Sequence, residues 1–185
     1  MPNSLLTIGS STLAWAEFIN RLERHVVGCI IDVRSFPRSR HPCYNKAPMR
    51  TGLNRRGIAY IYLGDCLGGH VVDQATSYAH RITLPEFREG IGEVVSIAKR
   101  CRPALLCAEG EPLDCHRAVV IARYLAQTGR ADIGHILRDG RLEPHRELEE
   151  RLLRRAGLQA DLFADRAERL SDAYAARLLR MGLRP

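Results

Sequence analysis

Short apolar runs alternate with segments of helical periodicity, and this alternation restricts the chain to a few folds. The runs expected to form strands are Leu5–Ile8, Cys29–Val33, Ile58–Leu63, the run that begins at Ala104, and Ile133–Leu137. Between them apolar residues recur at helical spacing, as in Trp15, Phe18, Ile19 and Leu22. Because such alternation favours parallel strands joined by right-handed crossovers, we predict a three-layer α/β fold. Its largely parallel sheet should have about five strands with flanking helices.

The length of 185 residues and the hydrophobic content of 45% fit a single globular core. We expect an α/β domain over residues 1–153 and a charged helical extension over residues 154–185, packed on the domain or on the partner subunit of a homodimer. No targeting segment and no apolar stretch of about 20 residues is present, so we expect a cytoplasmic protein without membrane contact. The six cysteines form no C-x-x-C pair and are expected to be free thiols.

Reactive side chains gather directly after the apolar run from Ala104. They are Cys107, Glu109, Cys115, His116 and Arg117. Asp114 is a suitable N-cap, so a helix is expected to start there with Cys115 in its first turn. Because ligands of α/β folds bind where a strand ends and the next helix begins, we expect these side chains at one rim of the sheet.

A second feature is a basic segment between Val33 and Gly64 without Asp or Glu. Its basic residues are Arg34, Arg38, Arg40, Lys46, Arg50, Arg55 and Arg56. The formal net charge of +7 equals the charge of this segment. Such an excess favours an anionic ligand, either phosphate, nucleotide or nucleic acid, although a solvated basic loop is the alternative. Asp32 lies just before the segment and, if it is buried, should pair with Arg34 or another arginine of the segment.

The first functional hypothesis is an enzyme acting on a phosphate-bearing or nucleic-acid substrate. Cys115 would be the nucleophile, with His116 as proton shuttle and Glu109 as base or as partner of Arg117. Arg34, Arg38 and Arg117 would hold the anion. The alternative is that Cys107 and Cys115 are inert core residues. An anion cradle with arginine six positions after the cysteine is excluded, since Leu113 and Ile121 stand there.

The second hypothesis is a non-catalytic module that binds a nucleotide or nucleic acid. Phe36 and Tyr44 are interleaved with the basic residues, and Tyr60 and Tyr62 share one face of a predicted strand. Phosphate contacts and base stacking would then provide the affinity. The alternative for the two tyrosines is one edge of the core. The long connection from Gly64 to His80 is expected to be a lid or a binding loop.

A metal site is the third possibility. Cys107, Cys115 and His116, with Cys66 or His70, offer zinc-type donors, but their spacing matches no known zinc finger. Adjacent residues of a helix point about 100° apart, so Cys115 and His116 are not expected to share one ion. We therefore predict no metal and no other cofactor.

The chain also resembles the DUF488 family of bacterial and archaeal proteins. The segments that carry the resemblance are Thr7–Gly9, Asp32–Ser39, Leu67–Gly69, Cys107–Glu109, Cys115–Arg117 and His135–Ile136. The resemblance implies an α/β fold and marks as motif positions Asp32, Arg34, Pro37, Ser39, Asn45, Cys107, Glu109, Cys115, His116 and Arg117. Ser10 and His70 depart from the family pattern.

The residue pattern and the resemblance together define a candidate site. Its expected catalytic residues are Cys115, His116, Glu109 and Asp32. Its expected anion-binding residues are Arg34, Arg38, Ser39, Arg40, Asn45, Arg117 and Cys107. The family is a domain of unknown function, so the resemblance implies the site without implying a reaction.

Overall fold

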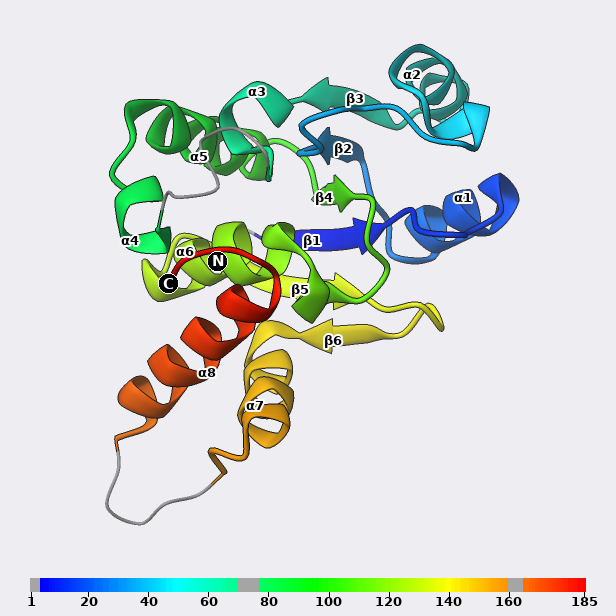
Figure 1. The fold of residues 1–185 in the computed structure, drawn as a ribbon. Helices are drawn as coiled ribbons and strands as arrows, with labels where there is room; N and C mark the ends of the chain where they lie inside the picture. Colours follow the sequence, from blue (N-terminus) through cyan, green and yellow to red (C-terminus); the bar gives the residue numbers. More distant parts are fainter. Residues whose placement is uncertain (1–3, 70–76, 160–164) are drawn as a thin grey trace.

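A six-stranded sheet forms the centre of the molecule in the computed structural model, which describes residues 4–69, 77–159 and 165–185. The strand order is β3-β2-β4-β1-β5-β6 (Figure 1). The strands are β1 (Ser4–Gly9), β2 (Cys29–Asp32), β3 (Ala59–Tyr62), β4 (Pro103–Cys107), β5 (Asp132–Ile136) and β6 (Leu142–Pro144). Only β6 is antiparallel to its neighbour. The predicted α/β fold with a largely parallel sheet is confirmed.

The helices connect and cover the strands. They are α1 (Trp15–Arg24), α2 (Lys46–Asn54), α3 (Gly64–Leu67), α4 (Tyr78–Arg81), α5 (Pro85–Ala98), α6 (Arg123–Gln127), α7 (His145–Ala156) and α8 (Arg166–Arg180). Two 3₁₀ turns, Pro42–Tyr44 and Pro112–Asp114, and a π-helix, Arg117–Ala122, complete the described elements.

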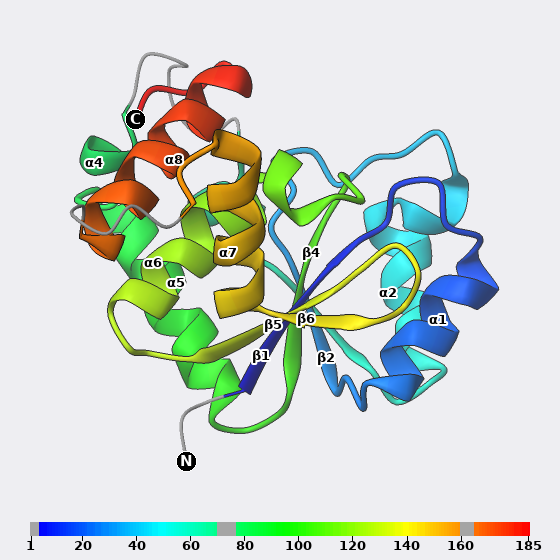
Figure 2. The ribbon, with the colours of Figure 1, turned by 90° about the horizontal axis from the view of Figure 1, so that it is seen from below.

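Helices cover both faces of the sheet because successive strand residues point to opposite faces. On β4, Leu105 packs on the side of α5 and the π-helix, whereas Ala104 and Leu106 pack on the side of α1 and α2. Figure 2 shows α1 and α2 on one side of the sheet and α5 to α8 on the other. The result is three layers with two apolar interfaces.

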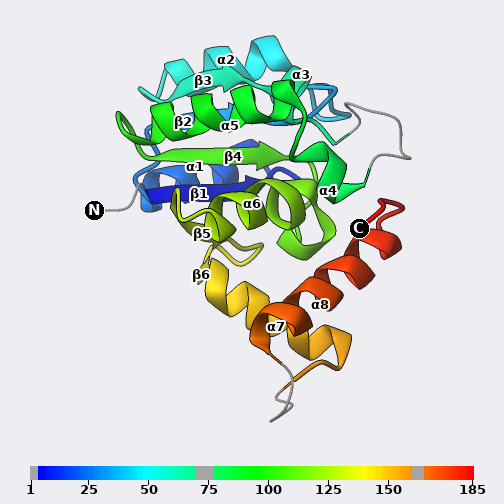
Figure 3. The ribbon, with the colours of Figure 1, turned by 90° about the vertical axis from the view of Figure 1, so that its left-hand side faces the viewer.

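The carboxyl ends of the parallel strands lie at one edge of the sheet (Figure 3). Gly9 of β1 is in register with Cys107 of β4, and Asp32 of β2 is in register with Leu106. The basic segment therefore leaves β2 beside the point where Cys107 ends β4. Two segments about seventy residues apart in sequence meet at this edge.

One strand is missing from the prediction and one local expectation is wrong. β6 is only three residues long and ends in a proline; the Asp139-Gly140 turn, with Gly140 at a φ of +83°, is the signal that could have found it. Asp114, the expected N-cap, does not cap a helix, because it ends a 3₁₀ turn.

The C-terminal helices α7 and α8 pack on the face that carries the π-helix and α6 (Figures 1 and 3). The expected boundary at residues 153 and 154 falls within α7. Residues 160–164 of the expected helical extension lie outside the described residues, as does His70 in the expected lid. All six cysteines are free thiols, as predicted.

Candidate functional site

One cavity of about 440 Å³ opens at the carboxyl edge of the sheet. Three parts of the chain form most of its wall: the loop after β2, the segment from the end of β4 to His116, and the turn after α8. Its lining residues are Arg34, Ser35, Phe36, Arg38, Gly69, Cys107, Ala108, Glu109, Asp114, Cys115, His116, Met181, Gly182 and Leu183. The basic loop and the reactive cluster therefore share one hollow.

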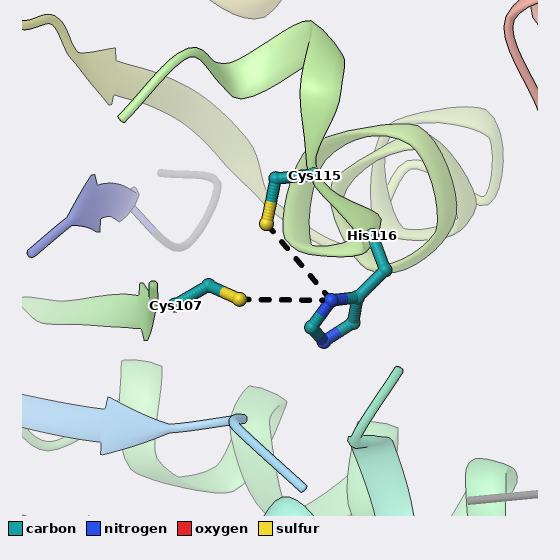
Figure 4. Close-up of side chains that lie close together, drawn as sticks. All are labelled: Cys107, Cys115 and His116. Carbon is teal, nitrogen blue, oxygen red and sulfur yellow. Dashed lines mark hydrogen bonds between the residues drawn. The ribbon is translucent and has the colours of Figure 1, made fainter. Parts of the chain in front are cut away.

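Two sulfur atoms and an imidazole nitrogen point toward one another (Figure 4), and the three residues that carry them line this cavity. The Sγ atoms of Cys107 and Cys115 lie 3.6 Å and 3.9 Å from Nδ1 of His116. All three side chains are buried, with Cys115 only 1% exposed. We call Cys107, Cys115 and His116 the sulfur–imidazole cluster.

The backbone around Cys115 explains how neighbouring residues can converge. Glu111 caps the Pro112–Asp114 turn by accepting a hydrogen bond from the Leu113 N–H at 3.1 Å. Cys115 then adopts an extended conformation with φ of −137° and ψ of 136°, and the π-helix begins only at Arg117. The expectation that Cys115 and His116 point apart assumed that both are helical. That assumption is wrong, because Cys115 precedes the helix.

The His116 ring is held by the backbone of Val33, the residue directly after β2. Its Nε2 lies 3.1 Å from the carbonyl oxygen of Val33, which can only accept a hydrogen bond, so Nε2 carries the proton in the neutral ring. Nδ1 is then left with a lone pair that faces both sulfurs. Gly69 packs against the ring, and a Cβ at residue 69 would come within 3.0 Å of Nδ1. Both contacts fix the direction of the lone pair.

Glu109 brings a carboxylate to the same place. The Cys107 thiol donates to its Oε2 at 2.9 Å and the Cys115 thiol donates to the same oxygen at 3.2 Å. Burial acts to raise the pKa of Glu109, but the bond from Cys107, the backbone N–H and the bond from Cys115 together lower the pKa below its ordinary value. Burial raises the pKa of the Cys115 thiol well above 9, so as a lone thiol it stays protonated at neutral pH.

Arg117 supports the cluster from behind. It is 0% exposed, and its two terminal nitrogens donate to the carbonyl oxygens of Glu109 at 2.6 Å and of Gly110 at 3.2 Å. It does not line the cavity. Arg117 therefore holds the Glu109 loop in place. The sequence had instead suggested that Arg117 binds the anion.

Asp32 and Arg34 form the buried ion pair expected from the sequence. Arg34 donates from Nε and Nη2 to the two carboxylate oxygens of Asp32 at 2.9 Å and 2.6 Å, and the Tyr60 hydroxyl donates to Oδ2 at 2.6 Å. Burial alone would lower the pKa of Arg34, but the bonds from Asp32 outweigh it and raise the pKa. Arg34 borders the cavity, whereas Asp32 is 0% exposed and does not line it.

The other members of the basic segment divide between surface and support. Arg38 is exposed and lines the cavity, whereas exposed Arg40 does not. Asn45 accepts a hydrogen bond from the Ser39 N–H at 2.8 Å, which ties the basic loop to the start of α2.

The Lys46 ammonium lies 3.8 Å from the centre of the Tyr62 ring. Tyr44 is fully buried and Tyr60 nearly so, hence of the aromatic residues considered only Phe36, which is 72% exposed, stands open at the cavity.

Sequence reasoning missed the C-terminal wall of the cavity. Met181, Gly182 and Leu183 reach it because Arg177 of α8 donates to the Leu113 carbonyl at 2.6 Å and pairs with Asp114. No local pattern predicts this long-range docking; the Arg177 and Asp114 charges become informative only once the fold is known.

The sulfur–imidazole cluster is also a set of potential metal ligands. Within the described residues it is the group of metal-binding side chains whose ligand atoms all lie within 4.8 Å of one another. Cys66, considered from the sequence as a further donor, is not in this group.

Comparisons with known proteins identify a family but no characterised relative. The family model described as Domain of unknown function DUF488 matches residues 14–125, more than half of the chain. No curated protein and no solved structure matches significantly. Over the described ranges, no helix has the length and apolar character needed to traverse a membrane.

Proposed function

Because the chain belongs to the DUF488 family, a domain of unknown function, only its own site can indicate its activity, and we propose an enzyme that acts on a phosphate-bearing small molecule. One observation carries the proposal: a single cavity is lined both by Arg38 and by Cys107, Glu109, Cys115 and His116. An anion bound by Arg38 would bring its neighbouring atoms into the same cavity as these four side chains.

The size of the cavity favours a small molecule over a nucleic-acid strand. Its volume of about 440 Å³ lies within the range of small-molecule sites, about 300–1,000 Å³. Two of the seven basic residues of the segment are paired with carboxylates, since Arg34 is bound to Asp32 and Arg56 to Glu23. A nucleotide-sized substrate fits these observations better than a polymer does.

The lining of the cavity suggests which part of the substrate goes where. Arg38 supplies the cation for the phosphate. Phe36 on the same loop, and Met181 and Leu183 in the turn after α8, offer apolar surface for a base or another flat group. The substrate class that satisfies both is a nucleotide or a similar phosphorylated, partly apolar compound.

The proposed roles separate residues that touch the substrate from residues that position others. Glu109, His116, Cys107 and Cys115 face the reacting group. Asp32 and Arg34 hold the start of the basic loop, and Arg117 holds the Glu109 loop, through buried bonds. Ser39 and Asn45 fix the basic loop, and Arg40 adds to its positive charge.

The test is turnover of a panel of nucleotides, sugar phosphates and short oligonucleotides, followed by mass spectrometry. We expect the wild type to convert a nucleotide-sized compound, Arg38→Ala to raise KM about tenfold or more, and Glu109→Gln to lower kcat. Arg55→Ala, an exposed arginine of the same basic segment outside the cavity lining, is the matched control and should leave both constants unchanged. Equal conversion by the wild type and Glu109→Gln would contradict the proposal.

Non-catalytic binding is the second candidate, favoured by Phe36, Arg38 and Arg40 standing exposed on one loop. It predicts that a labelled nucleotide or oligonucleotide binds without conversion and that Arg38→Ala with Arg40→Ala abolishes binding. If the wild type converts any compound of the panel and Glu109→Gln does not, purely non-catalytic binding is excluded.

We retain the homodimer expected from the sequence as a proposal, and an interface on α8 would cover Leu179, which is 62% exposed. Sedimentation of the wild type and of Leu179→Lys tests it. A wild-type monomer at micromolar concentration would contradict it.

A further inference from the structure

We propose that Cys107, Cys115 and His116 bind one thiophilic divalent cation, Zn²⁺ being the best match, through Sγ, Sγ and Nδ1. The site goes beyond the proposed function, since a cation could be held there with or without a substrate in the cavity. It also reverses the expectation from the sequence that no metal binds.

The distances within the cluster match the edges of a tetrahedral site. With bonds of about 2.3 Å to sulfur and about 2.05 Å to nitrogen, tetrahedral angles separate ligand atoms by roughly 3.5–3.8 Å. The two Sγ–Nδ1 distances are 3.6 Å and 3.9 Å, and all three ligand atoms lie within 4.8 Å of one another. The two Sγ–Nδ1 distances already fit, and the two sulfurs, at most 4.8 Å apart, would approach each other by no more than about 1 Å to reach the tetrahedral separation.

The hydrogen bond at Nε2 of His116 orients the imidazole so that Nδ1 can bind a metal ion. Metal-bound histidines usually donate their second ring N–H to a carbonyl or carboxylate, which fixes the tautomer. Here Nε2 donates to the Val33 carbonyl at 3.1 Å, so the Nδ1 lone pair faces the two sulfurs. Two soft sulfurs and one imidazole form a donor set typical of zinc.

The charges around the cluster would balance a bound cation. Binding releases both thiol protons to solvent, so that two thiolates neutralise one divalent ion. The guanidinium of the buried Arg117 acts electrostatically on Cys115 in the direction that favours its thiolate, while its hydrogen bond goes to the main-chain carbonyl of Glu109.

The fourth coordination position faces the cavity. The Oε2 atom of Glu109, a residue that also lines the cavity, lies 2.9 Å and 3.2 Å from the two sulfurs. Three protein ligands with an accessible fourth position are the pattern of catalytic zinc sites. A cation there would give the reacting side of the cavity a Lewis acid.

The first test is metal binding by the full-length wild type under reducing conditions. Titration with Zn²⁺ against a competing chelator should give one ion per chain with a dissociation constant below about 1 µM. X-ray absorption of the zinc complex should show two sulfur neighbours at about 2.3 Å and nitrogen or oxygen neighbours at about 2.05 Å. Co²⁺ in its place should give the intense bands of a tetrahedral thiolate complex.

Variants identify the ligands. Cys107→Ser and Cys115→Ser should each weaken Zn²⁺ binding about 100-fold or more, whereas Glu109→Gln should weaken it about tenfold. Cys66→Ser is the matched control, because this half-buried cysteine lies outside the cavity, and it should bind as the wild type does. Circular dichroism confirms that each variant is folded.

Two results would overturn the inference. One is a wild type that binds no stoichiometric Zn²⁺ or Co²⁺, a result that does not depend on any variant folding. The other is a bound ion whose absorption spectrum lacks sulfur neighbours. Turnover that depends on Arg38 in a protein that binds no metal would support the proposed function and contradict the metal site. Metal binding by a protein that turns over no compound would support the metal site and contradict the proposed function.

Discussion

The Sγ atom of Cys107 lies 3.6 Å from Nδ1 of His116, although the two residues come from different elements. Cys107 ends β4, and His116 follows an extended residue that separates a 3₁₀ turn from a π-helix. The Val33 carbonyl at the end of β2 orients the ring. Two strand ends and one irregular turn thus fix the position of the most reactive atoms in the cavity.

The buried Asp32–Arg34 pair should be essential for stability. Asp32→Ala would leave the Arg34 guanidinium and the Tyr60 hydroxyl without their shared acceptor. We expect the free energy of unfolding to fall by about 3–5 kcal/mol in urea denaturation. Glu23→Ala, which breaks the exposed pair with Arg56, should cost no more than about 1 kcal/mol. A loss for Asp32→Ala as small as that of this control would show that the pair contributes little.

Two glycine substitutions should change stability in opposite directions. A Cβ at Gly9 would collide with the Glu109 carbonyl oxygen, which Arg117 also holds, so Gly9→Ala should destabilise the protein by about 1–3 kcal/mol. At Gly92, on the exposed side of α5, a Cβ meets no atom within 4 Å among the described residues. Gly92→Ala should therefore stabilise by about 0.5–1 kcal/mol. Thermal unfolding of both variants checks the signs, and a neutral Gly9→Ala would mean that the Glu109 loop moves freely.

The protein should lose stability in mild acid through two buried histidines. His135 Nε2 and His145 Nδ1 lie 3.0 Å apart. This row of hydrogen bonds continues from His135 to the Thr7 hydroxyl and from His145 to the Tyr174 hydroxyl. Burial lowers the pKa of His145 from 6.5 to about 4. For His135, burial, His145 and the charges of Arg117 and Arg151 hold the pKa well below 6.5.

The sign of the pH dependence follows from these shifts. The folded protein favours the neutral rings, so their contribution is complete above pH 6.5 and is lost as the pH falls from 6.5 toward 4. For His145 the loss amounts to about 3 kcal/mol. Glu149, 3.7 Å from Nε2 of His145, would offset part of it. Urea denaturation at pH 7 and pH 4.5 measures the slope, which His145→Phe should flatten and the exposed His41→Gln should not; equal slopes for the wild type and His145→Phe would rule the mechanism out.

Arg117→Lys should weaken the site although the charge is kept. A lysine ammonium cannot reproduce the planar fork that reaches the carbonyl oxygens of both Glu109 and Gly110. We expect a loss of about 1–3 kcal/mol in the free energy of unfolding. Arg154→Lys, on the exposed side of α7, is the control and should change little. Wild-type stability of Arg117→Lys would show that the two bonds do not hold the loop.

Periodicity was sufficient to predict the layers and the main strands, because apolar runs such as Cys29–Asp32 and the helical spacing around Phe18 are local signals. The meeting of the basic loop with Cys107 follows from parallel strand order, and it could be anticipated for the same reason. The shape of the turn at Cys115 could not, because its extended backbone depends on the 3₁₀ turn before it and on the docking of Arg177 from α8.

The roles of the arginines were the hardest to predict. Sequence placed Arg34, Arg38 and Arg117 together as anion ligands, yet Arg34 is bound to Asp32 and Arg117 to backbone carbonyls. The number of charged residues in a sequence does not show which arginine side chains form buried ion pairs or hydrogen bonds within the protein. Only Arg38 of the three is exposed in the cavity.

Nuclear magnetic resonance mapping of a nucleoside monophosphate onto the isotope-labelled wild type addresses the shared cavity most directly. We predict saturable shifts of the Arg38 side chain, of the backbone around Phe36 and of residues 107–116, all reduced in Arg38→Ala. Shifts confined to another surface, or a lack of saturation at millimolar ligand, would contradict the assignment of this cavity as the functional site.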